Sequence, residues 1–171
     1  MRGVIFTLEQ EIASAIKFIL DSSGNPAPYY WNVPQDFVVP SAYFPTPEIE
    51  SSGDTLNSFN LNYSWYIKFF HKNTQSAHEL AFAALTEILQ NRNLIPLINE
   101  DGEFTGKGFR INDPELKKID DGAVQLTLNW DSRRPYHKNP ATKTKKFKID
   151  TYIKDAYENA LQNYNQNDTE D

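Results

Sequence analysis

The chain has 171 residues, of which 39% are apolar and 13% aromatic, and its formal net charge is -6. This length and composition predict one globular domain, with room for a terminal extension, and exclude a wholly disordered protein. Because the sequence contains no cysteine, it cannot supply a disulfide framework, a thiolate nucleophile or a thiolate metal site. No apolar run approaches the roughly 20 residues that cross a bilayer, so we expect no membrane partner.

The charge is unevenly distributed along the sequence. Residues 133–148, called the basic strip below, contain seven basic residues and no acidic one, so the rest of the chain carries a net charge of -13. Such a strip suggests docking to an acidic partner surface or to nucleic-acid phosphates. A solvated basic loop explains the pattern equally well.

The N-terminal segment has the pattern of a helix from about residue 8 to residue 21. Thr7 and Gln10 have the spacing of a capping box, and apolar residues recur at helical intervals after them. Gly24 and Pro26 then end the helix, since glycine and proline are common just after a helix C-terminus.

The next segment, residues 26–47, contains six of the ten prolines, interleaved with aromatic residues. Proline lacks the backbone donor of a β ladder, so we expect short extended pieces or an edge strand around residues 37–44. Residues 50–57 are rich in serine, glycine and aspartate and are expected to form a turn or an exposed loop.

Residues 59–70 alternate between two faces, which indicates a long strand. One face is apolar throughout and should be covered by helices. It consists of Phe59, Leu61, Tyr63, Trp65, Ile67 and Phe69. A second helix is expected from about residue 75 to residue 91, where Ser76 and Glu79 match a capping box and an apolar stripe follows.

Two further strand regions complete the main domain. An apolar run at residues 94–98 and a returning strand at residues 109–112 enclose a glycine-rich hairpin tip with the pair Asp101-Gly102. Asp113-Pro114 is expected to break the chain before a last strand at residues 124–131. The order of helix, strands, helix and strands predicts an α+β fold, a mainly antiparallel mixed sheet with two helices packed on one face.

The C-terminal part has a different character. Apolar residues recur at helical spacing over residues 151–164, which predicts an additional C-terminal amphipathic helix that packs on its own domain or on a neighbouring subunit. Residues 165–171 are polar and acidic and are expected to be disordered. The predicted organisation is therefore a domain at residues 1–137 followed, at residues 138–171, by a basic linker, the helix and the tail.

The sequence contains little that supports catalysis. The three histidines, His71, His78 and His137, lack the spacing of a helical metal pair. The glycine-rich hairpin lacks the Lys-Ser/Thr of a phosphate loop, and the Gly-x-Ser-x-Gly motif of a nucleophile elbow does not occur. We therefore expect no enzyme, no metal and no other cofactor. A nucleic-acid-binding module stays open, because an aromatic strand with Lys68 and a basic strip would suit it, although core packing explains those aromatic residues more simply.

The order of these elements resembles the tail terminator proteins of siphoviruses and myoviruses. The segments that carry the resemblance lie within residues 5–136 and are SFNLNYSWYIKFFH, SAHELAFAALTEIL, LIPLINEDGE and GAVQLTLNWDSRRPY. The resemblance is one of pattern, without a diagnostic motif. It implies a tail-terminator-like domain over residues 1–137 and a ring, usually of six subunits, that caps the finished tail tube, stops its polymerisation and offers a surface for head attachment.

The implied partners follow from that role. They are other copies of the chain, the tail tube protein and a head-completion or connector protein, and DNA would pass through the ring only as cargo. The implied location is the neck region of the virion tail, after assembly in the host cytoplasm. The candidate subunit or partner contacts are Asp101, Arg133, Arg134, Tyr136, Lys145 and Lys146. The alternatives are another head-tail connector or tail-tube protein, and the nucleic-acid-binding module above.

Overall fold

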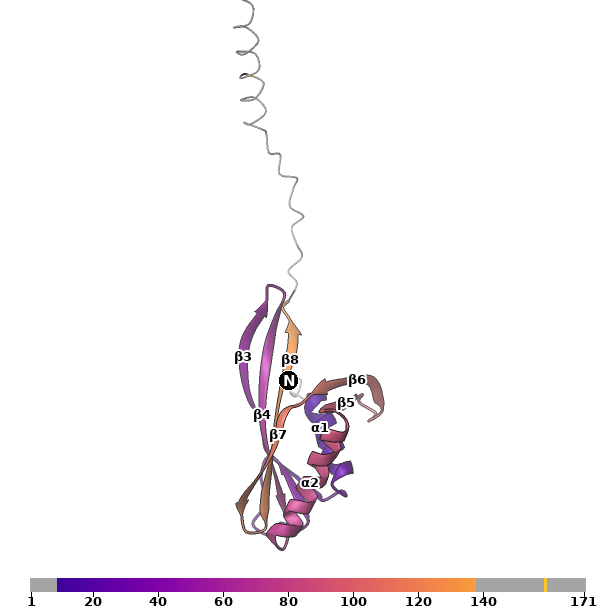
Figure 1. Cartoon of the computed structure of the whole chain (residues 1–171), viewed down its shortest axis with the longest axis vertical. Helices are drawn as coiled ribbons and strands as arrows, with labels where there is room; N and C mark the ends of the chain where they lie inside the picture. The colour runs from indigo at the N-terminus through magenta and orange to yellow at the C-terminus, as the bar shows by residue number, and fades with distance from the viewer. Residues whose placement is uncertain (1–8, 138–158, 160–171) are drawn as a thin grey trace, which may run out of the picture. The chain divides into compact units, whose positions relative to one another are not determined.

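The computed structural model describes residues 9–137 and residue 159 (Figure 1). Its elements are α1 (Gln10–Ser22), β1 (Ala27–Tyr30), β2 (Ser41–Phe44), β3 (Glu48–Thr55), β4 (Ser58–Phe70), α2 (Thr74–Gln90), β5 (Leu94–Ile98), β6 (Phe104–Arg110), β7 (Asn112–Asp120) and β8 (Ala123–Pro135). Two helices and a mostly antiparallel mixed sheet confirm the predicted α+β fold. Except for Asn159, the predicted C-terminal helix and tail lie outside the described residues, so the division after residue 137 stays a prediction.

Strand β4 is the centre of the main sheet. Along one side it pairs with β8 over its whole length, residues 58–70 against 123–135. Along the other side it pairs with β2 at residues 68–70 and with β3 at residues 58–64. β1 runs parallel to β2, and β7 pairs with residues 123–129 of β8. Strands β5 and β6 pair with each other as a separate hairpin.

At one end the main sheet narrows to three strands. There β3 flanks Ser58–Ser64 of β4, which in turn pairs with Asn129–Pro135 of β8. We call this part the ribbon, and Figure 1 shows that it extends beyond the two helices. Phe59 and Leu61, which the sequence placed on the apolar core face, lie in the ribbon and are therefore only half-buried.

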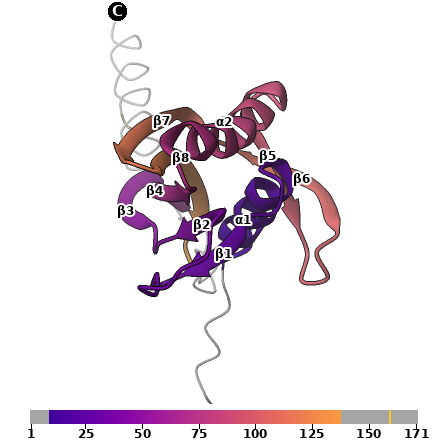
Figure 2. The same cartoon turned by 90° about the horizontal axis from the view of Figure 1, so that it is seen from below.

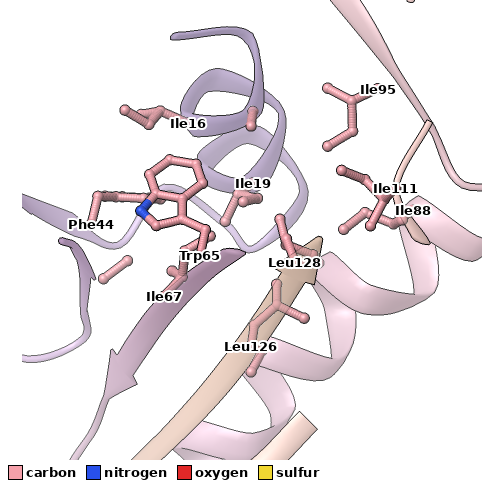
Figure 3. Packing of buried hydrophobic residues seen from close by; sticks show 14 of the residues in the cluster. Ile16, Ile19, Phe44, Trp65, Ile67, Ile88, Ile95, Ile111, Leu126 and Leu128 are labelled. Carbon is pink, nitrogen blue, oxygen red and sulfur yellow. The ribbon is translucent and has the colours of Figure 1, made fainter. Parts of the chain in front are cut away.

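Both helices cover the same face of the main sheet (Figure 2). The face of β4 beneath them is buried as the alternation predicted, from Tyr63 to Phe69. It meets Ile16 and Ile19 of α1, Ile88 of α2 and the leucines of β8 in one apolar cluster (Figure 3). Complete burial of one such side chain stabilises the fold by roughly 1.5–3 kcal/mol, so this cluster fixes where the strands and helices lie.

The predicted loop at residues 50–57 is wrong. Strand β3 occupies Glu48–Thr55, and a turn follows before β4 begins at Ser58. All eight residues of β3 are exposed, so the strand has no apolar face to create an alternating pattern. Backbone pairing with β4 forms it, from Glu48 opposite Ser64 to Thr55 opposite Ser58.

Two other strand expectations need correction. The expected edge strand at residues 37–44 begins only at Ser41, and it is internal, because β1 pairs with its outer side. The expected break at Asp113-Pro114 lies inside β7, where an irregularity between Asn112 and Glu115 interrupts the ladder. A proline is tolerated at such an irregularity because its missing N–H has no ladder partner to lose there.

The helices begin differently from the two predicted capping boxes. Helix α2 starts at Thr74, and the Asn73 side chain accepts a hydrogen bond of 2.8 Å from the backbone N–H of Ser76, so Asn73 is the N-cap in place of Ser76. Helix α1 has Glu9 at its N-cap position without a side-chain capping bond. Thr7, the predicted cap of α1, lies outside the described residues.

Candidate assembly surface

An apolar groove opens where β4 changes its strand partner. The segment that joins β2 to β3 contains Pro45 and Pro47, which have no backbone N–H to give to a ladder. Between the pairing of β2 and that of β3, residues 65–67 of β4 therefore lack a partner on this side. The groove at this gap has a volume of about 660 Å³ and is lined by α1, the end of β1, the β2–β3 segment and the start of β3.

The floor of the groove is fixed by aromatic packing. The Phe44 ring lies between two others, with centroids 5.8 Å from Tyr30 and 5.8 Å from Trp65. The indole N–H of Trp65 donates a hydrogen bond to the carbonyl of Pro45, which ties the proline segment to β4. Ile12 and Ile16 of α1 close the inner wall. The groove is thus largely pre-formed in the isolated chain.

The rim of the groove exposes apolar side chains to solvent. Trp31 is 63% exposed and Ile49, near the start of β3, is 48% exposed. Trp31 has a φ of 67°, a left-handed conformation that is unusual for a bulky residue. Its carbonyl accepts a 3.1 Å hydrogen bond from the Tyr43 hydroxyl, which helps to hold it there. Exposed apolar rims of this kind are typical of binding surfaces, and held strain of this kind is typical of functional sites.

Two glutamates fasten the start of α1 to the sheet beside the groove. Glu11 accepts hydrogen bonds from the indole N–H of Trp130 at 3.0 Å and from the Ser132 hydroxyl at 2.8 Å. Glu9, which also lines the groove, accepts one from the Tyr63 hydroxyl. Burial and this hydrogen bond raise the pKa of Tyr63, so the hydroxyl stays protonated and donating. The glutamates therefore act as structural acceptors that anchor α1.

Arginine side chains at the end of β8 join this cluster and the ribbon. Arg134 lies 3.8 Å from a carboxylate oxygen of both Glu9 and Glu11. Arg133 lies 2.7 Å from one oxygen of Asp54 in β3 and donates to the other at 3.1 Å. The Ser58 hydroxyl also donates to Asp54, and this hydrogen bond together with Arg133 lowers the pKa of that carboxyl.

The six predicted contact residues fall at three places in the chain. Asp101 is exposed in the turn between β5 and β6. Arg133 and Arg134 lie near the end of β8, where both have acidic partners within their own chain, and Tyr136 follows them, 47% exposed with its ring 5.3 Å from Phe59. Lys145 and Lys146 lie outside the described residues. Contacts of these residues with a neighbouring molecule stay a prediction.

Sequence reasoning missed the groove itself. Its rim residues stand in the proline-rich segment and in β3, which have no regular alternation. The available signal was the density of aromatic residues among prolines, which indicated packing but not where a cavity would open. Within residues 9–137 and residue 159, no cluster of three or more potential metal ligands occurs. No helix in that part of the chain is long and apolar enough to cross a membrane.

Comparison with known proteins identifies two relatives. The chain is 37% identical over 126 residues to the uncharacterized protein YqbJ of Bacillus subtilis (strain 168), an alignment that covers 74% of this chain and 86% of YqbJ. It is 34% identical over 131 residues to the phage-like element PBSX protein XkdJ of the same organism, which covers 77% of this chain and 89% of XkdJ. No protein-family model matches the chain.

Among solved structures, a chain described as "Virion of native gene transfer agent (GTA) particle" aligns with 80% of this chain and 100% of that one. The TM-score is 0.45 and the sequence identity is 12%. Similarity of this degree carries no conclusion about function, so the relatives above are the ones that matter.

Proposed function

This chain belongs to the family of XkdJ and YqbJ, and from that premise we propose that it is a structural protein of a phage or phage-like particle. More narrowly, we propose the tail terminator, a ring that caps the tail tube, ends its polymerisation and provides the head-attachment surface. The proposed location is the neck of the particle, after assembly in the host cytoplasm. The name of XkdJ, a protein of a phage-like element, supports the broader part of this proposal.

The observation that carries the narrower part is the placement of two unlike surfaces on one domain. Figures 1 and 2 place β3, whose start lines the groove, on one side of the domain and the β5–β6 hairpin on the other. β3 is an exposed edge strand with no pairing on its outer side among the described residues. Unlike surfaces on opposite sides favour head-to-tail association, which closes into a ring when the rotation between neighbours allows it.

A ring of this kind needs binding and no chemical reaction. Its partners would be other copies of the chain, the tail tube protein below and a head-completion or connector protein above. The ring would leave DNA to pass through as cargo. This role is consistent with a groove that is predominantly apolar and with glutamates that are occupied in anchoring α1.

The nucleic-acid alternative loses part of its basis. It required the aromatic residues of β4 to stack on bases, but Tyr63, Trp65 and Phe69 are buried beneath the helices. A stacking platform needs exposed rings. The part of the basic strip beyond His137 lies outside the described residues, so it favours neither the tail terminator nor the nucleic-acid-binding module.

Tail tubes assembled with and without the purified chain test the proposal. We expect the chain to bind at tube ends, visible by negative-stain electron microscopy, and to stop further growth when more tube protein is added. Incorporation of the chain along lengthening tubes would identify a tube protein instead. Tubes that bear no chain at their ends and that grow at the normal rate would contradict the proposal.

A further inference from the structure

We propose that the β5–β6 hairpin of one copy docks into the apolar groove of the next copy, with Phe104 as its anchor. The inference rests on the proposed function, since it names the contact through which the ring would close. It further predicts an asymmetric contact, in which each chain offers its hairpin to one neighbour and its groove to the other.

The hairpin is held to the domain at its base and carries an apolar side chain near its tip. Six of the seven residues of β6 are exposed, and Phe104, the first of them, is 65% exposed. At the base, Ile95 and Phe109 are buried in the domain core. Such a preorganised element loses little conformational entropy when it binds.

Helix α1 separates the hairpin from the groove of the same chain. The backbone of Ile98 in β5 receives a hydrogen bond from Gln10 at 2.9 Å and donates one to the Ser14 hydroxyl at 3.0 Å. Ile12 and Ile16, which line the groove, are each two positions away. Side chains two positions apart are rotated by about 200° around the helix axis, so they lie on nearly opposite sides of the helix. A hairpin that docks in the groove must therefore come from another copy.

The groove suits an aromatic anchor. Its walls combine the rings of Trp31, Tyr30 and Phe44 with aliphatic side chains, and aromatic pairs add roughly 0.5–1.5 kcal/mol to the burial of their area. A volume of about 660 Å³ admits a phenylalanine and part of the strand that carries it. Docking would also cover Trp31, which the isolated chain leaves exposed.

The hairpin and the groove both carry charged side chains around their apolar parts. The tip of the hairpin carries Glu100, Asp101 and Glu103, whereas the end of the groove at Glu9 has Arg134, whose side chain is 38% exposed. Glu9 and Glu11 each lie 3.8 Å from Arg134, and its Nε donates to the Ser132 hydroxyl, so a tip carboxylate near Arg134 would also meet these two acids.

The charges complement each other between strands β6 and β3. Lys107 and Arg110 of β6 are exposed, and so are Glu48 and Glu50 of β3. None of these four has an ion-pair partner among the residues that the structure describes. A hairpin seated with β6 beside β3 brings these basic side chains near the acidic ones, which favours this orientation over one that sets the acidic tip beside β3.

Disulfide trapping in the 171-residue chain tests the docking, because the sequence has no native cysteine to interfere. Thr46→Cys places a thiol in the groove and Glu103→Cys places one beside Phe104, while both leave the anchor intact. The two single variants are mixed and oxidised, with and without tail tubes. A docked pair has a far higher effective concentration than colliding molecules, so we expect at least roughly tenfold more linked dimer than in a mixture of Glu103→Cys with Ala83→Cys, an exposed control on α2.

A second comparison isolates the anchor. Adding Phe104→Ser to the Glu103→Cys variant should abolish the excess of linked dimer, whereas adding Phe82→Ser, which removes a phenylalanine 52% exposed on α2, should preserve it. Equal linking to both thiols, or linking that survives Phe104→Ser, would overturn the docking. So would a small apolar molecule or a tube-protein loop found in the groove of the assembled ring. Capping of tail tubes by the reduced variants is measured separately. Capping without specific linking refutes the docking alone. Linking without capping refutes the terminator role.

Discussion

At the scale of single residues, the fold depends on a few polar contacts that bridge distant parts of the chain. Glu11 is the clearest case, because its carboxylate accepts hydrogen bonds from Trp130 and Ser132, more than a hundred residues away. Both donors belong to buried residues of β8. The Glu11 side chain therefore contributes to the position of α1 and, with it, of the inner wall of the groove.

The substitution Glu11→Ala should destabilise the domain. The change leaves the Trp130 indole N–H and the Ser132 hydroxyl without their acceptor, and an unsatisfied buried polar group costs roughly 1–3 kcal/mol. Urea unfolding measures the loss in the free energy of unfolding. Glu79→Ala, an exposed change on α2, serves as control and should shift that free energy by less than about 0.5 kcal/mol. Equal values for the two variants would disprove the anchoring role of Glu11.

The sequence predicted core residues better than polar partners. The alternation at Tyr63, Trp65, Ile67 and Phe69 identified buried positions, because burial follows the two-residue period of a strand. The acidic partners of Arg133 and Arg134 could not be predicted, since Asp54, Glu9 and Glu11 are far away in the sequence and approach only when the sheet forms.

At the scale of elements, the ribbon is the part whose stability should depend most on charge. Ser58 and Arg133 both bind Asp54 and lower the pKa of its carboxyl below its usual value. A carboxyl with a lowered pKa in the folded state stabilises that state above its unfolded pKa. The contribution disappears as the pH falls through the lowered folded value.

Asp54→Asn should therefore be less stable than the wild type at pH 7, and the difference should shrink when the pH is lowered below about 4. Urea unfolding at pH 7 and at pH 3 provides the two values. Arg133→Gln removes the ion pair from the other side and should show the same trend. A difference for Asp54→Asn that is constant across this pH range would show that the charge of Asp54 is irrelevant to stability.

Elements with a regular apolar pattern were predicted well, and those formed by backbone pairing were not. The bounds of α1, α2, β4 and β8 lie close to the expected ranges. Residues 50–57 were expected to form a turn or loop because they are rich in serine, glycine and aspartate. Backbone pairing with β4, the next strand in the chain, makes most of them part of β3. The groove follows from the absence of N–H groups at Pro45 and Pro47, and sequence reasoning recognised their effect on pairing but not the cavity beside β4.

At the scale of the whole molecule, the described domain carries two unlike surfaces that expose apolar side chains. It exposes an apolar groove on one side and a hairpin with an exposed phenylalanine on the other. The relatives include a protein of a phage-like element. The proposed ring would use both surfaces, one toward each neighbour.

The mass of the purified chain at rising concentration, measured by light scattering after size-exclusion chromatography and repeated on isolated tail tubes, tests the ring most directly. The account predicts one closed oligomer whose mass does not change with concentration, formed in solution or at the tube end. A mass that increases continuously with concentration, or a chain that stays monomeric both in solution and beside the tubes, would contradict it.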